Sequence, residues 1–346
     1  MIKKGGLLSY ILIITIISIM ILPTTTISKT VKNSYTENEK EYYALIGGGP
    51  FLENTTTNIF IDIIYSEKQN RYVYDSLLKS KNWKEENIIL LTEEQATKDN
   101  VTNALINLSK KVDENDVFFF SWHSHGNRVL DDDGDESIYD ESDIYDEVIL
   151  PYDGKIIDKD HVLNYITDDE LAEYLTMFNC ESVIVSIECC FSGGFGDDIS
   201  YAFEKENKSV FIMLSTDEDC FEWFHPRLNW GWDAFLADSL SSSYSDKNND
   251  GWVSAEEAFE NAAPTYFFRT YFSRHSSIFL MGSIGFNKIL KFFELTNMKR
   301  ILLSGFLSLI LVRIVEMRDY KILGANAMNR AHCYDQYDGE LLITKL

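Results

Sequence analysis

The sequence predicts an α/β fold with a mainly parallel central sheet and helices on both of its faces. Between residues 42 and 283, short apolar runs alternate with segments of helical periodicity. Near-continuous apolar runs are typical of strands that are covered on both faces, as in parallel sheets. The predicted strands span residues 42–46, 87–92, 117–122, 182–187, 210–214 and 278–281.

Two helices between these strands are indicated by local patterns. Val101, Leu105, Leu108 and Val112 follow the spacing of one helical face. The stretch 167–170 begins with threonine and ends with glutamate just before an apolar segment, which is the pattern of a capping box. Strands that alternate with helices in this way predict two helical layers around one sheet.

Composition excludes several classes of protein. The chain has 346 residues, is 45% hydrophobic and carries a formal net charge of -24. It can therefore bury a core, and its surface repels nucleic-acid backbones, so nucleic acid is not expected as a partner. Five cysteines are too few for a disulfide scaffold and leave an unpaired thiol within the chain.

The segments at the two ends of the chain differ in composition from the residues between them. Lys3 and Lys4 precede an apolar run over residues 7–22, so 1–28 are predicted to be a secretory signal or a retained membrane anchor, and 29–41 a linker. Residues 287–330 are basic and apolar, and their uncharged core is too short for a typical span. This segment and the N-terminal run are the candidates for membrane contact. Residues 331–346 are expected to be a tail.

Reactive side chains follow two of the predicted strands. His123, Ser124, His125 and Gly126 come after the strand at 117–122, and the segment 188–194 comes after the strand at 182–187 with two cysteines and two glycines. A histidine from a neighbouring strand can act as base for a cysteine nucleophile. Glycines let backbone amides approach a substrate carbonyl and form an oxyanion hole. These strand ends therefore predict acyl-transfer chemistry.

The segments 116–126 and 188–194 resemble the paired His-Gly and acid-x-Cys-x-Ser-Gly motifs of the caspase-like cysteine peptidases, especially those of legumain and the metacaspases. Residues 43–46 and 86–91 are also similar to the opening of a legumain-type domain. The resemblance covers roughly residues 42–283. It implies a caspase-hemoglobinase-like sandwich over residues 42–286.

The resemblance also implies roles for individual residues. His125, which precedes Gly126, would be the general base, and Cys190 would be the nucleophile. The amides of Gly126 and Cys190 would hold the oxyanion, and no cofactor would take part in catalysis. Cys189 is expected to pack in the core. For His123, an ordinary polar neighbour and a partner of His125 both stay open.

Two acids are candidates for substrate binding. Glu188 shares a strand face with Cys190, and the resemblance places it in the pocket for the residue before the scissile bond. The alternative is a solvated acid at the edge of the strand. Asp217 belongs to an acidic stretch after the strand at 210–214, where a pocket lining and a solvated loop are both open.

Two acidic segments are candidates for cation binding. Residues 246–257 match the spacing of an EF-hand loop, in which oxygen ligands alternate and a glycine permits the sharp turn. A single loop predicts a structural Ca²⁺ site with these ligands: Asp246, Asn248, Asp250, Trp252, Ser254 and Glu257. Residues 131–147 contain ten acids and no Lys or Arg. One interpretation of this segment is a solvated insertion. The other is a loop beside the His125 strand end that depends on calcium or is cleaved by the protein itself.

The sequence as a whole thus predicts an extracellular or cell-surface cysteine endopeptidase that acts on peptides or proteins and binds structural calcium. Two alternatives stay open. A transamidase would use the same acyl-enzyme with an amine in place of water. A catalytically idle, calcium-binding surface domain would keep the fold without the chemistry.

Overall fold

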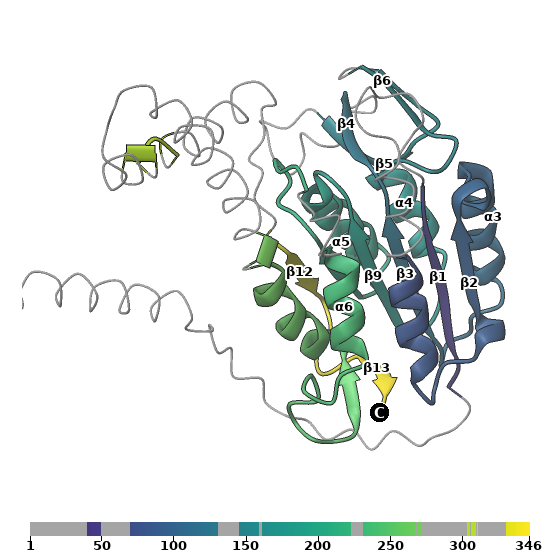
Figure 1. The fold of residues 1–346 in the computed structure, drawn as a ribbon. Helices are drawn as coiled ribbons and strands as arrows, with labels where there is room; N and C mark the ends of the chain where they lie inside the picture. The colour runs from purple at the N-terminus through teal and green to yellow at the C-terminus, as the bar shows by residue number, and fades with distance from the viewer. Residues whose placement is uncertain are drawn as a thin grey trace, which may run out of the picture. The chain divides into compact units, whose positions relative to one another are not determined.

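A computed structural model of the protein describes residues 40–49, 70–130, 145–158, 161–222, 231–267, 269–270 and 330–346, together with 303–304, 306–308 and 310 (Figure 1). In these parts of the chain, a six-stranded sheet has the order β12-β10-β9-β3-β1-β2. Its strands are β1 (Tyr42–Gly48), β2 (Ile88–Thr92), β3 (Val117–His123), β9 (Ser182–Glu188), β10 (Val210–Leu214) and β12 (His332–Asp335).

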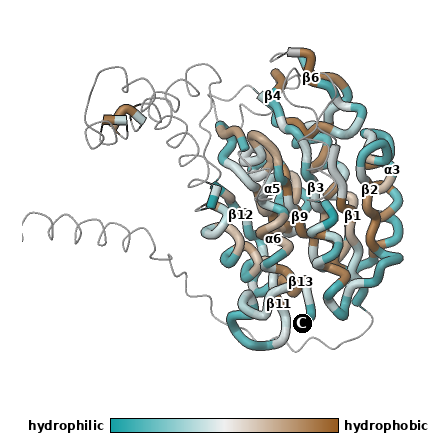
Figure 2. The backbone as a smooth tube through the Cα atoms, viewed as in Figure 1, coloured by the Kyte–Doolittle hydropathy of each residue, from teal (hydrophilic) through white to brown (hydrophobic). Residues whose placement is uncertain are grey.

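The first five strands are parallel to their neighbours, and only β12 runs antiparallel, beside β10. All residues of β1, β3, β9 and β10 are buried, which explains their lack of alternation in the sequence. Figure 2 shows this concentration of hydrophobic residues in the central strands. The predicted fold class and the five predicted strands up to residue 214 are confirmed.

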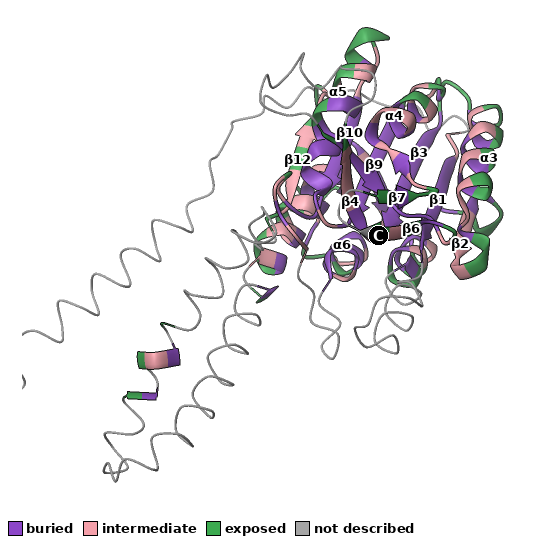
Figure 3. Cartoon of the chain, turned by 90° about the horizontal axis from the view of Figure 1, so that it is seen from above, coloured by how far each residue is buried: buried purple, intermediate pink, exposed green. Residues whose placement is uncertain are grey.

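Alternate residues of each strand enter two separate cores. One face packs Leu45, Phe120 and Val185 beneath α3 (Lys98–Ser109), α4 (Asp168–Thr176) and α5 (Phe195–Lys205). The other packs Ile46 and Phe119 against α6 (Trp232–Leu240) and the helical residues 70–79 and 255–267. Figure 3 shows the buried strands between the two helical layers. The predicted sandwich is therefore observed.

The helix start predicted at Thr167 is also confirmed. Thr167 is the N-cap of α4, and its side chain accepts a hydrogen bond from the amide of Glu170 at 3.1 Å. Thr97 caps α3 in the same way through the amide of Asn100. Short 3-10 turns, η1 (Glu85–Asn87) and η2 (Glu93–Gln95), flank β2.

Two small antiparallel sheets follow β3 in the chain. One joins β4 (Gly126–Leu130), β5 (Tyr145–Ile149) and β8 (Ile166–Thr167), and the other joins β6 (Lys155–Asp158) and β7 (His161–Leu163). Because β4 begins at Gly126, three residues after the end of β3, this sheet holds the segment that contains His125 against the edge of the central sheet.

The C-terminal residues are not a tail, and the predicted end of the domain at residue 286 is wrong. The strand β12 closes one edge of the central sheet, and β13 (Leu342–Lys345) pairs with β11 (Trp252–Ser254). Ile343 is fully buried, and its carbonyl accepts a hydrogen bond from the Trp83 indole at 2.9 Å. These strands contain four residues each, so they leave little pattern in the sequence.

Several predicted features lie outside the described residues. These are the N-terminal segment 1–28, the linker up to residue 39, the strand at 278–281, the acidic residues 131–144 and nearly all of 287–330. Within the described residues, no helix combines the length and the apolar character that a membrane crossing requires. Membrane contact stays a prediction.

Candidate active site

The two predicted reactive strand ends are neighbours in space. Strands β3 and β9 pair in parallel register from Val117 opposite Ser182 to His123 opposite Glu188. Beyond this last pair, the amide of Ser124 donates to the Glu188 carbonyl at 3.1 Å. The sheet therefore delivers His125 and Cys190 to the same edge, as strands of equal direction must.

His125 lies in the short connection between β3 and β4. Its carbonyl accepts hydrogen bonds from the Ser124 hydroxyl at 2.7 Å and from the Leu150 amide at 3.0 Å. The Trp122 indole in turn donates to the Ser124 hydroxyl at 2.9 Å. These contacts fix the backbone that carries the half-buried His125 ring.

Gly126 packs directly against the backbone of Cys190. A β-carbon at Gly126 would overlap the carbonyl oxygen of Cys190 and lie 2.9 Å from Sγ of Cys189. Only glycine allows the two connections to approach so closely. This contact is the clearest geometric sign that the His-Gly segment and the cysteine segment form one site.

The turn that contains Cys190 is held on its far side by the end of β10. Phe191 adopts a left-handed conformation, with φ of 64°, and its amide donates to the Cys220 carbonyl at 2.8 Å. Ser192 exchanges hydrogen bonds with Thr216, whose hydroxyl also donates to the Cys189 carbonyl at 3.2 Å. A left-handed non-glycine residue costs on the order of 1–3 kcal/mol, so this turn is held by its surroundings.

The glycines that follow the cysteine are required by close packing. They belong to the turn η4 (Ser192–Gly194), which leads directly into α5. A β-carbon at Gly193 would overlap the amide nitrogen of Glu218, and one at Gly194 would overlap the carboxylate of Glu147. The glycines thus let two acidic segments pack closely beside the predicted nucleophile.

The two cysteines have different environments. Cys189 is fully buried in the core beneath α3, α4 and α5, as predicted. Cys190 is half-buried, and its sulfur accepts a hydrogen bond from the Glu222 amide at 3.3 Å. The structure therefore leaves Cys190 as the more accessible thiol of the pair.

Both members of the predicted dyad are neutral near pH 7. Burial, assisted by the nearby His123, lowers the pKa of His125 to about 4. Burial and the Glu222 charge raise the pKa of Cys190 to about 12. The substrate-free site therefore holds a thiol and a neutral imidazole, which suits transfer of the thiol proton to His125 during attack.

This charge state predicts a pH profile for alkylation of Cys190 by iodoacetamide. With a pKa of about 12, the thiolate fraction is small at pH 7 and grows about tenfold for each pH unit. We expect the rate, followed by mass spectrometry of the Cys190 peptide, to rise without a plateau between pH 6 and 9. A plateau below pH 8 would instead indicate a thiolate-imidazolium pair. As a control, the alkylation rate of a small free thiol is measured in parallel at each pH.

Glu188 is fully buried, and its carboxylate is occupied by donors from the protein. It lies 3.1 Å from Nδ1 of His123 and accepts hydrogen bonds from the amides of Trp232 and Asp233 at 2.8 and 2.7 Å. Burial alone would raise the pKa of Glu188, but these partners hold it below its usual value. His123 is thus a buried neighbour of Glu188, and its charge also acts on His125, so the two roles stated for it stay open.

Three further residues near Glu188 were not predicted from the sequence: Asp233, Glu222 and Tyr266. Asp233 is fully buried at the start of α6, and burial and the Glu188 charge raise its pKa well above the usual value. The same two causes raise the pKa of Glu222, which accepts a hydrogen bond from Tyr266 at 2.8 Å. Neither acid stands in a recognisable motif, and only the fold brings them near Glu188.

Asp217 lies at the other side of the cysteine turn, where it pairs with Nε2 of His332 at the start of β12. This partner comes from the segment that had been expected to be a tail. The substrate-binding roles of Glu188 and Asp217 stay predictions, because both carboxylates contact protein groups here.

The EF-hand-like segment folds as a tight loop before the helix at 255–267. The carboxylate of Asp246 accepts hydrogen bonds from the amides of Asp250 and Gly251, both at 3.1 Å, and Gly251 has a φ of 88°. The carboxylate of Glu257 reaches back to the Lys247 amide at 2.6 Å and the Ser254 amide at 3.2 Å. The first and last predicted ligands thus converge on one loop.

A further carboxylate joins this loop. Glu340, from the C-terminal segment, accepts a hydrogen bond from the Asn248 side chain at 2.8 Å. Partial burial raises the pKa of Glu340, and so do the charges of Glu257, Asp250 and Asp246. The loop therefore concentrates negative charge and oxygen ligands of the kind that Ca²⁺ takes.

Known proteins resemble this chain over the site. The family model of the metacaspase peptidase C14 domain matches residues 64–198. Metacaspase-1B of Neurospora crassa is 36% identical over 101 residues, which are 28% of this chain and 21% of that protein. Metacaspase-6 of Arabidopsis thaliana is 31% identical over 130 residues, or 36% of this chain and 32% of that protein.

A longer match is to metacaspase-1 of Schizosaccharomyces pombe, with 25% identity over 269 residues, or 70% of this chain and 58% of that protein. The chain thus spans less than two thirds of the length of these relatives. A crystal structure of a Geobacter sulfurreducens protein superposes with a TM-score of 0.40 and 16% identity, covering 65% of this chain and 89% of that one. The matched family region contains both His125 and Cys190, so the similarity to the metacaspase peptidase domain includes both motif segments.

Proposed function

We propose that this protein is a cysteine endopeptidase that hydrolyses peptide bonds through Cys190 and His125. The observation that carries the proposal is the contact of Gly126 with the Cys190 backbone, which joins the two motif segments at one edge of the sheet. The matching metacaspase domain supports the same chemistry.

The proposed reaction has two steps. Cys190 attacks the substrate carbonyl as its proton passes to His125, and the amides of Gly126 and Cys190 hold the oxyanion. The amine product leaves with the proton from His125. Water, deprotonated by His125, then attacks the thioester and releases the acid product and the free thiol. An amine acceptor in place of water would make the enzyme a transamidase.

The substrate preference that we propose is for Arg or Lys before the scissile bond, with Asn second and Asp last. The buried Glu188 carboxylate, whose pKa is held below its usual value, lies two residues before Cys190, so an acidic side chain that entered beside it would meet like charge. A charge-assisted hydrogen bond to a basic side chain is worth about 1.5–3 kcal/mol, which corresponds to roughly one to two powers of ten in rate.

Fluorogenic peptides that differ only at this residue test the function and the preference together. We expect the Arg and Lys peptides to be cleaved about 10–100 times faster than the Asp peptide. The Cys190→Ala protein is the matched control and should cleave none of them. Fastest turnover of the Asp peptide would contradict the electrostatic argument, and fastest turnover of Asn would favour a legumain-like preference. Cleavage that survives Cys190→Ala would refute the peptidase proposal.

We also propose that the loop 246–257 binds one structural Ca²⁺ ion. The ligands would be the carboxylates of Asp246, Asp250 and Glu257, the side chains of Asn248 and Ser254, and the carbonyl of Trp252. The converging hydrogen bonds of Asp246 and Glu257 support this fit. A cation would relieve the repulsion among these acids and Glu340, and thereby tie the C-terminal segment to the loop.

Thermal melts test the calcium site. At a hundredfold excess over the dissociation constant, Ca²⁺ is expected to stabilise the wild type by about 2.7 kcal/mol. The Asp246→Ala/Glu257→Ala protein should lose this response. A Glu94→Ala/Asp99→Ala protein, with two exposed acids changed elsewhere, is the control and should keep it. An equal response in all three proteins would place calcium elsewhere.

Export to the cell surface or beyond is proposed from the N-terminal residues alone. The basic start and apolar run over residues 7–22 have the order of a secretory signal. Fractionation of cells that make the protein tests this, because a purely internal location would contradict it.

A further inference from the structure

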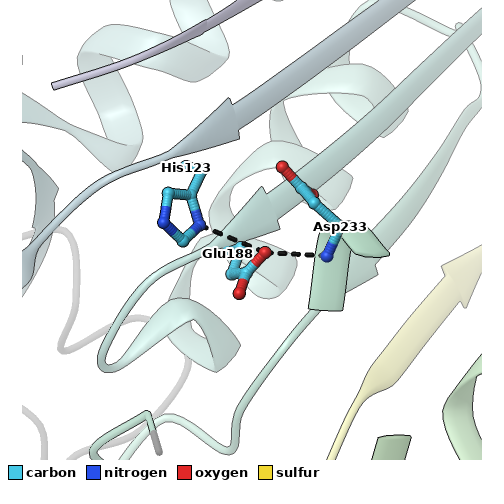
Figure 4. Close-up of side chains that lie close together, drawn as sticks. All are labelled: His123, Glu188 and Asp233. Atoms are coloured by element: carbon cyan, nitrogen blue, oxygen red, sulfur yellow. Dashed lines mark hydrogen bonds and ion pairs between the residues drawn. The ribbon is translucent and has the colours of Figure 1, made fainter. Parts of the chain in front are cut away.

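A second cluster of ionisable side chains lies beside the dyad without belonging to it. His123 ends β3, Glu188 ends β9 and Asp233 is the second residue of α6, and none of the three is more than 1% exposed. One ligand atom from each lies within 4.8 Å of the others. Figure 4 shows the His123 ring and the Asp233 side chain on either side of the Glu188 carboxylate.

The partners of the two carboxylates differ sharply. Glu188 has four: His123, the amides of Trp232 and Asp233, and the carboxyl group of Glu222. Asp233 has none among the described residues, since neither of its carboxylate oxygens accepts a hydrogen bond there. Burying a carboxyl group without a hydrogen bond costs several kcal/mol. The packing of α6 does not explain why an acid, rather than an apolar residue, stands at this position.

The spacing and the ligand types fit a tetrahedral cation. Zinc takes imidazole nitrogen and carboxylate oxygen at about 2.0–2.1 Å, which places neighbouring ligand atoms about 3.3 Å apart. The His123 and Glu188 atoms are already 3.1 Å apart, and Asp233 has the remaining oxygens within reach. Two carboxylates and a neutral imidazole would balance the charge of one divalent ion.

We propose that His123, Glu188 and Asp233 form a binding site for a divalent transition-metal ion of the zinc class. The amides of Trp232 and Asp233 orient the Glu188 carboxylate, in the role that outer hydrogen bonds play around metal ligands. Ca²⁺ is a poor fit because it prefers six to eight oxygen ligands. The ion would join the ends of two strands to the start of α6. It would also neutralise Glu188, to which we attribute the preference for Arg or Lys, so it would compete with a basic substrate side chain for this carboxylate.

The test uses the full chain with Cys190→Ala, so that the dyad thiol cannot bind metal or cleave the protein. Excess Ca²⁺ saturates the acidic loop at 246–257. Zinc affinity is then measured by competition with a chromogenic chelator. The Asp233→Asn variant removes one ligand charge with little change in shape and keeps the amide that orients Glu188. Asp238→Asn is the matched control, because Asp238 is an exposed acid of the same helix.

We expect the background protein and the Asp238→Asn protein to bind one zinc ion equally well. Asp233→Asn should weaken binding by at least about 100-fold, since removal of even an outer partner costs about 10–100-fold. Equal affinity in Asp233→Asn, or no zinc bound by the background protein at micromolar concentration, would overturn the site.

A second measurement covers the case in which Asp233→Asn fails to fold. Cobalt bound to the background protein should show the visible absorption of a tetrahedral nitrogen and oxygen site, without a thiolate charge-transfer band, and His123→Ala should remove the visible band. A thiolate band, or a visible band unchanged in His123→Ala, would refute the assignment. Because these tests use protein without Cys190, failure of the metal site is separate from failure of the peptidase proposal.

Discussion

Replacing Cys190 with alanine is expected to reduce peptidase activity by at least about 10³-fold, because no other group can form the acyl-enzyme. The Cys189→Ala protein should keep much of its activity. Cys189 is fully buried in the core, whereas Cys190 is half-buried beside the His-Gly segment. Initial rates with the preferred peptide, divided by the folded fraction from circular dichroism, measure both effects.

The Cys189→Ala and Cys190→Ala variants are matched, because each removes one thiol and the two positions are adjacent in the chain. The cavity left by Cys189→Ala is small and should lower the free energy of unfolding by only about 1 kcal/mol. Equal loss of activity in the two variants, with folding intact, would contradict the assignment of Cys190 as the nucleophile.

Gly126→Ala is expected to reduce kcat by about 10²-fold or more in protein that still folds. The new methyl group would overlap the Cys190 carbonyl and press on the Cys189 sulfur. Relief of this overlap must move the His125 segment away from the cysteine turn. Displacements of about 1 Å at a reacting centre are enough for a loss of this size.

Gly196→Ala is the matched control for this prediction. Its β-carbon would overlap the ring of Tyr334 in β12, so it creates a comparable clash with a residue outside both motif segments. It should lower the melting temperature and leave kcat per folded molecule near the wild-type value. Similar kcat for Gly126→Ala and the wild type would show that the contact with Cys190 does not position the dyad.

The central sheet could be predicted because its signal is local. Strands that are buried on both faces need apolar residues at nearly every position, and β3, β9 and β10 carry such runs. The threonine cap of α4 is equally local, because the capping side chain and its amide partner are three residues apart. The predicted helical layers follow from these elements and their order.

The C-terminal strands and the missing acids could not be predicted in the same way. The pairing of β12 with β10 depends on residues more than a hundred positions apart, and four-residue strands carry weak periodicity. The raised pKa values of Glu222 and Asp233 come chiefly from burial and from the Glu188 charge. Neither cause can be read from the surrounding sequence.

From residue types and their period alone, one can predict an α/β sheet with a histidine-glycine segment and a cysteine segment after two of its strands, because both are local properties. The folded structure is needed to show that β3 and β9 are neighbours, that Gly126 contacts the Cys190 backbone, and that Glu188 contacts His123 and the start of α6. The reason is physical: contact, burial and charge environment depend on which distant segments pack together, and packing is a property of the whole fold.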